Sequence, residues 1–377
     1  MNPNNLNEPL AVEMSPKLGN YGHDMCLPGD PFPSIRAEGK ANLNYSLDAA
    51  AGRYLVVANL VNASEACFDD AVSAAKSHRA FFNDTDISFF GFLDAESPWR
   101  QKVQDDLPGV RWLFFRRDAD VDLQRIPPFC WILVDPTLRV LARAPLQFHQ
   151  SFLSSLALLP PPAMHGGGGV IDPPVLIVPR IFEPDFCAEL IRHYDSDGGQ
   201  PSGFMREVAG RTVVQHDLNY KRRRDVIIGE GPLRNATRAR ISRRLAPQIS
   251  RAFQFDATRI ERYLIAAYDG DEGGWFRPHR DNTTKGTAHR KFAVSINLNA
   301  DYDGGELRFP EYGNRTYRPP LGGGCVFSCS LLHEAISVRR GRRYAFLPFL
   351  YDEAAAVIRK ENAAFLGLTG LGDIEHL

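Results

Sequence analysis

A proline- and glycine-rich segment near the middle of the chain constrains its fold more than any other feature. Three prolines, Pro160–Pro162, are followed by four glycines, Gly166–Gly169, and then by Pro173 and Pro174. Proline lacks a backbone donor and glycine leaves the backbone free, so neither half of this segment favours a helix or a strand. We therefore place a linker at 160–174 and expect a separate domain on each side of it.

The length and composition agree with two globular domains. The chain has 377 residues, of which 44% are hydrophobic and 24% are charged, and this supplies material for two cores. We divide the chain into a polar N-terminal arm at 1–27, an α/β domain at 28–159, the linker at 160–174, a β-rich domain at 175–352 and a partly helical C-terminal tail at 353–377.

Charge, cysteine content and hydropathy limit the cellular compartment and the kinds of binding partner that we expect. The 44 basic and 45 acidic residues leave a net charge of −1, so no global field attracts nucleic acid or a membrane surface. Six cysteines in a chain of this length do not make a disulfide framework. The first residues lack the basic-then-apolar pattern of a signal segment, and no stretch is long and apolar enough to span a bilayer. We expect a cytoplasmic protein that binds neither membrane nor nucleic acid.

Strand and helix patterns alternate before the linker. Tyr54–Val61 is a short apolar run rich in β-branched residues, typical of a strand buried on both faces. Further elements are predicted as a helix at 65–80, strands at 87–93 and 111–115, a hairpin at 127–142 that turns at Asp135 and Pro136, and a helix at 148–159. This order predicts a small α/β sandwich.

Two motifs of this domain, Pro28–Pro33 and the hairpin residues Ile132–Leu141, resemble the peroxiredoxin branch of the thioredoxin-like fold. The reactive cysteine of that branch sits in a P-x-x-x-[TS]-x-x-C pattern. Aligned on Cys67, this chain keeps the hydroxyl at Ser64 but has no proline, and an apolar residue near Phe129 replaces the arginine of the branch.

Without a cationic neighbour a thiol stays protonated and is a poor nucleophile. We therefore expect a redox-inactive domain used for binding or scaffolding, through which the chain contacts a protein partner. Cys67 and Cys130 are then small apolar packing residues. The alternative is a working thiol peroxidase that uses Cys67.

The segment after the linker begins with a strand and two helices and then changes to strands. The helices are predicted at 183–193 and 232–253. Strands are predicted at 175–182, 292–298, 306–309, 325–328, 335–338 and 344–349. In the second strand Phe292, Val294, Ile296 and Leu298 alternate with smaller or polar residues, which predicts a half-buried strand whose apolar face belongs to the barrel core. Short strands at this spacing predict a double-stranded barrel or sandwich.

A histidine, an aspartate and a second histidine form a candidate metal site in this β region. His279 and Asp281 lie two residues apart, so on an extended strand their side chains project from one face. His333 supplies a third ligand from a distant strand. Two imidazoles and one carboxylate that leave coordination positions open are the arrangement of non-haem Fe(II) oxygenases.

An arginine downstream could complete the site. Arg343 follows the turn at Gly341 and shares one strand face with Ala345. Its guanidinium could hold the distal carboxylate of a dicarboxylic cosubstrate with two hydrogen bonds. Arg342 is the competitor for this role.

The ordered set of His279-x-Asp281, Asn297-Leu-Asn299, Gly304–Phe309, His333 and Gly341–Tyr344 resembles the 2-oxoglutarate/Fe(II)-dependent oxygenase superfamily, and most of all its prolyl 4-hydroxylase-type catalytic domain. The resemblance implies a double-stranded β-helix (jelly roll) with flanking helices, in which His279, Asp281 and His333 bind Fe(II). It implies that Arg343 binds 2-oxoglutarate with help from Tyr268, and that ascorbate serves as a reductant. Arg280, between the ligands, departs from the aromatic or acidic residue common in prolyl hydroxylases.

The resemblance implies a dioxygenase that uses O2 and 2-oxoglutarate to hydroxylate an unactivated C–H bond of a peptide, prolyl-type or small-molecule substrate, with succinate and CO2 as co-products. The alternative is an inactive binding or scaffold protein built from degenerate oxygenase and thioredoxin-like domains. A basic region at 206–251, including Lys221–Arg224, is interpreted as a solvated face, with an anion-attracting rim as the second interpretation. Cys325 and Cys329 lack a second cysteine pair, so we assign them to packing rather than to zinc.

Overall fold

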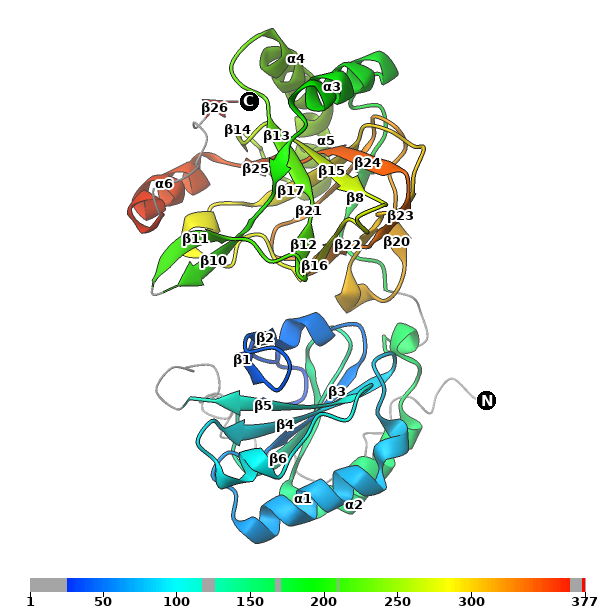
Figure 1. The fold of residues 1–377 in the computed structure, drawn as a ribbon, viewed down its shortest axis with the longest axis vertical. Coiled ribbons are helices and arrows are strands. Elements are labelled where there is room, and N and C mark those ends of the chain that lie inside the picture. Colours follow the sequence, from blue (N-terminus) through cyan, green and yellow to red (C-terminus); the bar gives the residue numbers. More distant parts are fainter. Residues whose placement is uncertain (1–25, 117–125, 167–170, 209, 367–374, 377) are drawn as a thin grey trace. The chain divides into compact units, whose positions relative to one another are not determined.

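The computed structural model describes residues 26–116, 126–166, 171–208, 210–366 and 375–376, so most of the predicted arm at 1–27 lies outside the described residues. The chain divides into two compact units. Unit 1 comprises Met1–Asp172 together with Pro310–Asn314, and unit 2 comprises Pro173–Phe309 together with Arg315–Leu377. Both units are rich in β-strands (Figure 1). Within the described ranges, no helix has the length and hydropathy of a membrane span.

Unit 1 contains a mixed sheet. Its described strands are β1 (Arg36–Gly39), β2 (Tyr45–Ser46), β3 (Tyr54–Asn59), β4 (Ile87–Asp94), β5 (Val110–Phe115), β6 (Cys130–Val134) and β7 (Val140–Pro145), in the order β2-β1-β5-β4-β3-β6-β7. Strand β4 pairs in parallel with β3 and β5, and β6 and β7 form an antiparallel hairpin beside β3. The predicted strands and the hairpin are therefore confirmed as a mixed α/β layer structure.

Two helices lie on the same side of this sheet (Figure 1). Helix α1 (Glu65–Ser77) begins after Ser64, whose hydroxyl accepts a hydrogen bond from the Cys67 amide, and α2 (His149–Ser154) continues into a short 3-10 turn. Phe152 of α2 stacks on Trp131 of β6, and Phe68 of α1 lies against Trp99 and Trp112 in the same core. The amphipathic spacing of these segments explains why one face of each helix is buried.

The two cysteines of unit 1 differ in their surroundings. Cys130 is buried, its Sγ donates to the carbonyl oxygen of Pro127 at 2.9 Å, and burial raises the pKa of this thiol to about 12. Cys67 is exposed on α1, so its prediction as a packing residue is wrong. The helical period explains the difference, because Cys67 faces away from the stripe that carries Phe68 and Ala71.

Unit 2 is built from antiparallel strands. The larger sheet has the order β26-β14-β25-β17-β24-β15-β13-β9, with β21 beside β17 and β8 beside β21, and the smaller sheet has the order β12-β16-β22-β19-β20. The strands of the larger sheet are β8 (Leu176–Val178), β9 (Gln200–Pro201), β13 (Arg224–Ile227), β14 (Arg259–Glu261), β15 (Leu264–Asp269), β17 (Phe292–Asn297), β21 (Gly324–Ser328), β24 (Arg342–Phe346), β25 (Phe349–Tyr351) and β26 (Glu375–His376). The strands of the smaller sheet are β12 (Lys221–Arg222), β16 (Trp275–His279), β19 (Leu307–Arg308), β20 (Thr316–Tyr317) and β22 (His333–Ala335). Two further pairs are β10 (Phe204–Val208) with β11 (Arg211–Gln215), and β18 (Asp303–Gly304) with β23 (Val338–Arg340).

Helices cover one face of the larger sheet (Figure 1). They are α3 (Pro184–Asp197), α4 (Pro232–Arg240) and α5 (Ala246–Phe253), and a further helix, α6 (Glu353–Glu361), lies in the C-terminal tail. The helix predicted at 232–253 is a single helical run with a π turn at Ile241–Leu245. This turn directly precedes Pro247, which cannot donate a helical hydrogen bond, and π turns accommodate such interruptions.

Strand β17 is buried on both faces, so its prediction as half-buried is wrong. Val294, Ile296 and Leu298 were assigned to the barrel core, but they pack with residues of α3 and α5 in the core between the larger sheet and its helices. Ser295 and Asn297, on the other face, are also buried. A second core cluster, formed by Leu264, Ala266, Tyr268, Phe276, Ala335 and Val338, joins the two sheets.

Two of the predicted strands are interrupted. The segment 335–338 divides between β22 and β23, and the segment 344–349 divides between β24 and β25. Pro348 lies at the second interruption, where a missing backbone donor ends strand pairing.

Candidate metal centre

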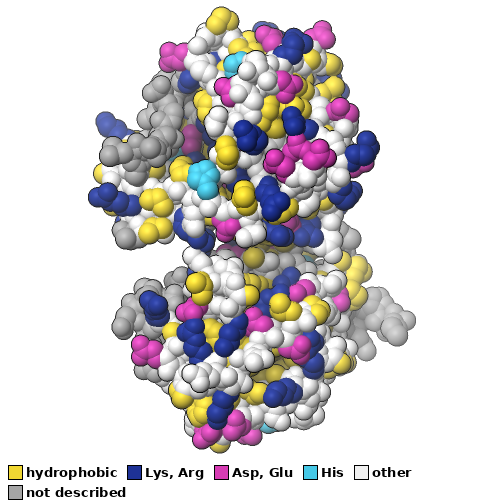
Figure 2. All heavy atoms as spheres, in the orientation of Figure 1, with side chains coloured by type: hydrophobic (Ala, Val, Ile, Leu, Met, Phe, Trp, Pro, Cys, Tyr) yellow, Lys and Arg dark blue, Asp and Glu magenta, His cyan; other side chains and the backbone are white. Residues whose placement is uncertain are grey.

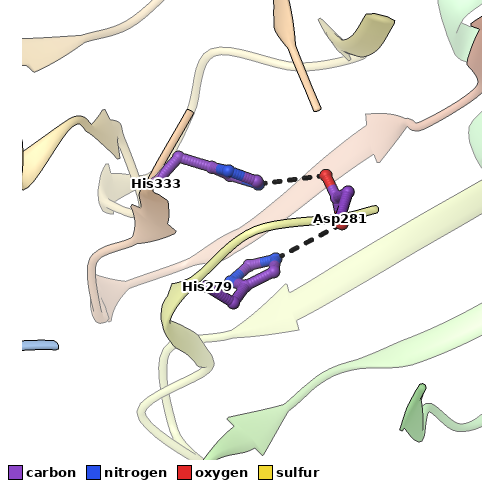
Figure 3. Close-up of side chains that lie close together, drawn as sticks. All are labelled: His279, Asp281 and His333. Atoms are coloured by element: carbon purple, nitrogen blue, oxygen red, sulfur yellow. Dashed lines mark ion pairs between the residues drawn. The ribbon is translucent and has the colours of Figure 1, made fainter. Parts of the chain in front are cut away.

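The three predicted ligands meet at one end of the smaller sheet. His279 is the last residue of β16 and pairs in register with His333, the first residue of β22. Asp281 lies beyond the end of β16, so its position does not come from strand alternation as predicted. Instead its amide donates to the carbonyl oxygen of Cys329 at 2.9 Å, which fixes the turn that returns the carboxylate toward the histidines. Figure 3 shows the three side chains pointing toward one another.

The donor atoms lie close enough to share one ion. His279 Nε2 is 3.6 Å from Asp281 Oδ1, and His333 Nε2 is 3.3 Å from Asp281 Oδ2. One donor atom from each residue lies within 4.8 Å of the others. Among the described residues, these three form the group of side chains that could hold one metal ion together. Their side chains are 11%, 13% and 7% exposed for His279, Asp281 and His333, so the site is enclosed without being sealed.

Backbone carbonyl groups orient both imidazoles. The Nδ1 atom of His279 lies 2.7 Å from the carbonyl oxygen of Arg277, and that of His333 lies 3.0 Å from the carbonyl oxygen of Leu331. A carbonyl accepts only, so each Nδ1 carries the proton and each Nε2 presents a lone pair toward the aspartate. Metal-bound histidines have this arrangement, in which the distant nitrogen is held by a carbonyl group.

The charge states suit metal binding as well. Burial, and then the neighbouring His333, lower the pKa of His279 to about 3, so its imidazole is neutral near pH 7. Burial alone would raise the pKa of Asp281, but His333 and His279 hold that pKa below its ordinary value. Two imidazole nitrogens and one carboxylate oxygen with room for further ligands match the donor set of non-haem Fe(II). The residues present therefore fit a ferrous ion.

Arg343 is a buried cation with neutral partners. It lies on β24 at 2% exposure, and its Nη2 donates to Ser295 Oγ at 2.7 Å and to Asn297 Oδ1 at 3.1 Å. In the described part of the chain, no carboxylate lies within ion-pair distance of this guanidinium. A buried charge of this kind is costly unless an anion accompanies it, so the site suits a carboxylate ligand.

Gly305 makes room for this arginine. Its φ is +73°, and a Cβ there would lie 2.8 Å from Val338 Cγ2 and 3.1 Å from Arg343 Cδ. A side chain at position 305 would therefore displace the arginine, and this explains why a glycine stands there.

Arg342 occupies a different environment. Its side chain is 48% exposed and forms an ion pair with Asp269, and its Nη1 also donates to Tyr344 Oη. Neighbouring residues on a strand point to opposite faces, so only one of the two arginines can face the sheet interior. That residue is Arg343.

Tyr268 lies beside Arg343, in register on the paired strand β15. The Arg343 guanidinium lies 5.4 Å from the centroid of the Tyr268 ring. The Tyr268 hydroxyl accepts a hydrogen bond from Arg223 Nη1 at 3.3 Å. The structure thus brings together the two residues that were predicted to bind the cosubstrate, and it adds Arg223 to them.

The basic region predicted as a solvated face is partly buried, so that prediction is wrong for Lys221 and Arg223. These residues are 5% and 7% exposed, whereas Arg224 is exposed. Strand alternation explains the difference, since residues two apart share one face. On the face of the molecule drawn in Figure 2, basic and acidic side chains are interspersed rather than gathered in one basic patch.

The remaining predicted residues lie near the site without forming a second one. Arg280 donates to the carbonyl oxygen of Ser330, in the turn that precedes His333. Cys325 and Cys329 are buried, and burial raises the pKa of Cys325 to about 12. The described residues contain no metal-capable cluster at these cysteines.

The comparisons with known proteins agree with the site. Residues 263–351 match the family model described as "2OG-Fe(II) oxygenase superfamily", whereas no curated protein matches the chain. This segment holds His279, Asp281, His333 and Arg343. Residues 263–351 therefore belong to the 2OG-Fe(II) oxygenase superfamily and carry its candidate iron site.

Solved structures of prolyl hydroxylases are similar to about half of the chain. A prolyl-4-hydroxylase from Pseudomonas putida shares 20% identity over 47% of this chain and 92% of its own, with a TM-score of 0.37. The viral collagen prolyl hydroxylase of Paramecium Bursaria Chlorella virus-1, with 2OG, shares 16% identity over 47% and 94%, with a TM-score of 0.36. A Trichoplax adhaerens prolyl hydroxylase, in complex with a peptide of hypoxia inducible factor, shares 17% identity over 49% and 86%, with a TM-score of 0.36.

Proposed function

We propose that the chain is an iron- and 2-oxoglutarate-dependent dioxygenase that hydroxylates an unactivated C–H bond of a peptide, prolyl-type or small-molecule substrate, with succinate and CO2 as co-products. The observation that carries this proposal is the convergence of three metal donors, with both Nε2 atoms directed at the Asp281 carboxylate. Backbone carbonyls orient both imidazoles, which leaves each Nε2 free to face a shared ion.

Different residues of the site bind the metal and the cosubstrate. Ferrous iron, when bound, supplies the O2 activation that side chains cannot. His279, Asp281 and His333 would hold the ion through two imidazole nitrogens and one carboxylate oxygen. Arg343 binds the carboxylate at the distal end of the cosubstrate, 2-oxoglutarate.

The groups around Arg343 preorganise this interaction. Ser295 and Asn297 accept hydrogen bonds from the guanidinium and so fix its plane before the cosubstrate arrives. The Tyr268 hydroxyl, which accepts from Arg223, keeps its own proton available for a cosubstrate oxygen. The enclosed position of these groups excludes water from the reacting centre.

We also assign the finer features of the two folds as part of this proposal. Unit 2 is a double-stranded β-helix with flanking helices, which its two antiparallel sheets support. Unit 1 is a thioredoxin-like domain of the peroxiredoxin branch that has lost thiol chemistry and binds a protein partner. The enzyme acts in the cytoplasm and uses ascorbate to keep its iron reduced.

The test is succinate formation by the purified full chain. We expect succinate to form from 2-oxoglutarate only when Fe(II) and O2 are present, and His279→Ala to abolish it. His193→Ala provides the control, because this histidine lies on α3 and contacts none of the candidate ligands. Iron-independent succinate formation, or full activity of His279→Ala, would contradict the assignment. No turnover together with an intact fold would favour the inactive scaffold instead.

A further inference from the structure

Lys221 is a second buried cation in unit 2. Its Nζ donates to Ser202 Oγ at 2.7 Å and to the carbonyl oxygen of Gly203 at 2.5 Å, and both acceptors are neutral. Within the described residues, no carboxylate lies in ion-pair range of this ammonium. Fully buried lysines are rare unless they are paired, so this side chain needs an explanation beyond packing.

One aromatic ring separates this ammonium from the metal site. Lys221 pairs with Phe276 across β12 and β16, and its Nζ lies 4.6 Å from the centroid of the Phe276 ring. The same ring stacks on the imidazole of His279, with centroids 3.5 Å apart. Lys221 therefore lies next to the metal ligands although it cannot be one of them.

Asp225, a carboxylate four residues after Lys221, is already paired. Asp225 receives two hydrogen bonds from Arg223, at 2.6 Å to Oδ1 and 2.7 Å to Oδ2. Asp225 also accepts a hydrogen bond from the Ser202 hydroxyl, and the oxygen of this hydroxyl accepts a hydrogen bond from Lys221 Nζ. Arg223 and Asp225 thus neutralise each other, and Lys221 has no carboxylate partner of its own among the described residues.

Lys221 and the cosubstrate anchor belong to different sheets. Lys221 belongs to the smaller sheet, through β12, whereas Arg343 belongs to the larger sheet, through β24. Tyr268 and Phe276 lie in the cluster that joins the two sheets. One dicarboxylic cosubstrate uses one carboxylate on Arg343 and the other at the metal, so Lys221 is left for a different anion.

We propose that Lys221 binds a carboxylate of the substrate, so the compound hydroxylated is an amino acid, another organic acid or an acidic peptide side chain. This inference rests on the proposed dioxygenase function and specifies its substrate class. Burial lowers the pKa of Lys221, and an entering carboxylate would favour the ammonium form and accept a charge-assisted hydrogen bond from it.

The test uses matched pairs of compounds that differ by one charge. Free L-amino acids are compared with their α-amides, and blocked tripeptides that contain aspartate or glutamate are compared with those that contain asparagine or glutamine. The readout is succinate formation by the full chain with Fe(II) and 2-oxoglutarate. We expect at least one acid to exceed its amide by about ten-fold or more in kcat/KM, because a hydrogen bond to a charged group contributes about 1.5–3 kcal/mol. Stimulation by the amino acids or by the peptides distinguishes the two sources of the carboxylate.

Two variants connect this preference to Lys221. Lys221→Met removes the charge, and Lys221→Gln removes it while keeping a donor for Ser202 and Gly203. Both should bring the acid-to-amide ratio close to one and leave the KM for 2-oxoglutarate unchanged. Arg222→Met is the matched control, since this neighbour on β12 donates to carbonyl groups at the surface and should keep the acid preference.

A binding measurement complements the kinetics. Anaerobic protein loaded with Fe(II) and 2-oxoglutarate is titrated with the preferred acid and its amide by isothermal calorimetry, which gives their Kd values without turnover. We expect the acid to bind about ten-fold more tightly, and Lys221→Gln to remove this difference.

The outcomes separate the two proposals. Succinate formation with no preference for acids, stimulation by neutral compounds alone or by none of the compounds, or variants that keep the acid preference would overturn the role of Lys221 while leaving the dioxygenase assignment intact. A raised KM for 2-oxoglutarate in Lys221→Gln would place Lys221 at the cosubstrate instead. Absence of iron-dependent succinate formation under all conditions would overturn the proposed function itself.

Discussion

The two units bury very different side chains. In the described part of unit 1, the buried polar residues are Asn59 and Ser88, and both are neutral. Unit 2 buries charged side chains in both of its sheets and in the segments around them, namely Lys221, Arg223, Glu261, Arg290, Glu334, Arg343 and Arg359. Buried charge is expensive, and perturbed ionisable groups concentrate at functional sites. The difference indicates that unit 2 carries the chemistry and that packing dominates unit 1.

The polar groups of unit 1 have evident structural roles. Asn59 Nδ2 donates to the carbonyl oxygen of Pro127 at 2.9 Å, and Ser88 Oγ donates to that of Asn83 at 2.8 Å. Each bond connects a strand to a neighbouring loop and satisfies a buried backbone acceptor. These hydrogen bonds stabilise the sheet, and they use the side-chain donors of Asn59 and Ser88 for structural contacts.

The largest expected effect follows from removing the carboxylate of the metal site. Asp281→Ala should abolish ferrous-ion binding and succinate formation, because the two imidazoles then lose their charged partner. Iron content after anaerobic loading and desalting measures this loss. Asp303→Ala is the control, since that carboxylate is 49% exposed and pairs with Arg340. Equal iron retention in both variants would contradict the site.

The next effect concerns a buried ion pair of unit 2. Glu261 accepts hydrogen bonds from Arg290 at 2.6 Å and lies 2.8 Å from His289 Nε2. Glu261→Gln should lower the free energy of unfolding by about 3–5 kcal/mol, because it leaves Arg290 buried without its partner. Chemical denaturation measures the change.

The same residue predicts a pH dependence. Burial alone would raise the pKa of Glu261, but Arg290 and His289 hold that pKa well below its ordinary value. The unfolded state therefore binds more protons, and stability is lost as pH falls from about 4.3 toward the lower folded pKa. Glu261→Gln should weaken this acid dependence. An unchanged acid slope would show that Glu261 does not contribute to it.

A smaller effect distinguishes the two adjacent arginines. Arg343→Met should raise the KM for 2-oxoglutarate about 10- to 100-fold, since a hydrogen-bonded charge contributes about 1.5–3 kcal/mol. Arg342→Met should leave this KM unchanged, because its guanidinium pairs with Asp269 at the surface. Succinate formation at varied 2-oxoglutarate concentration measures both. The reverse result would place the cosubstrate at Arg342.

The smallest effect tests packing in unit 1. A Cβ on Gly91 would lie 2.3 Å from atoms of the Trp112 ring, so Gly91→Ala should destabilise the protein by about 1–3 kcal/mol through overpacking. Gly229→Ala is the control, because no heavy atom lies within 4 Å of the added Cβ. Thermal unfolding of both variants measures the difference, and equal melting temperatures would contradict tight packing at β4.

The sequence predicted the parts of the molecule that follow strong local patterns. The apolar run at β3 and the helical stripes at α1 and α5 were sufficient to place those elements. The order of His279, Asp281 and His333 was sufficient to identify a candidate metal site. In each case a short-range pattern or a chemically distinctive set of residues carried the information.

The parts that were missed depend on tertiary contacts. Lys221 and Arg223 alternate with the less buried Arg222 and Arg224, and a basic run of this kind usually indicates a solvated face. Ser295 and Asn297 occupy the polar face of an alternating strand, and only the position of Arg343 shows that this face is buried. The turn that places Asp281 depends on Cys329, which is far away in sequence.

The central claim is that His279, Asp281 and His333 hold one ferrous ion together. The most direct test is a crystal of the full chain grown anaerobically with Fe(II) and 2-oxoglutarate, with anomalous diffraction recorded at the iron edge. We expect a single strong peak bounded by His279 Nε2, a carboxylate oxygen of Asp281 and His333 Nε2. A peak elsewhere in the molecule, or fully loaded crystals with no peak between these three atoms, would contradict it.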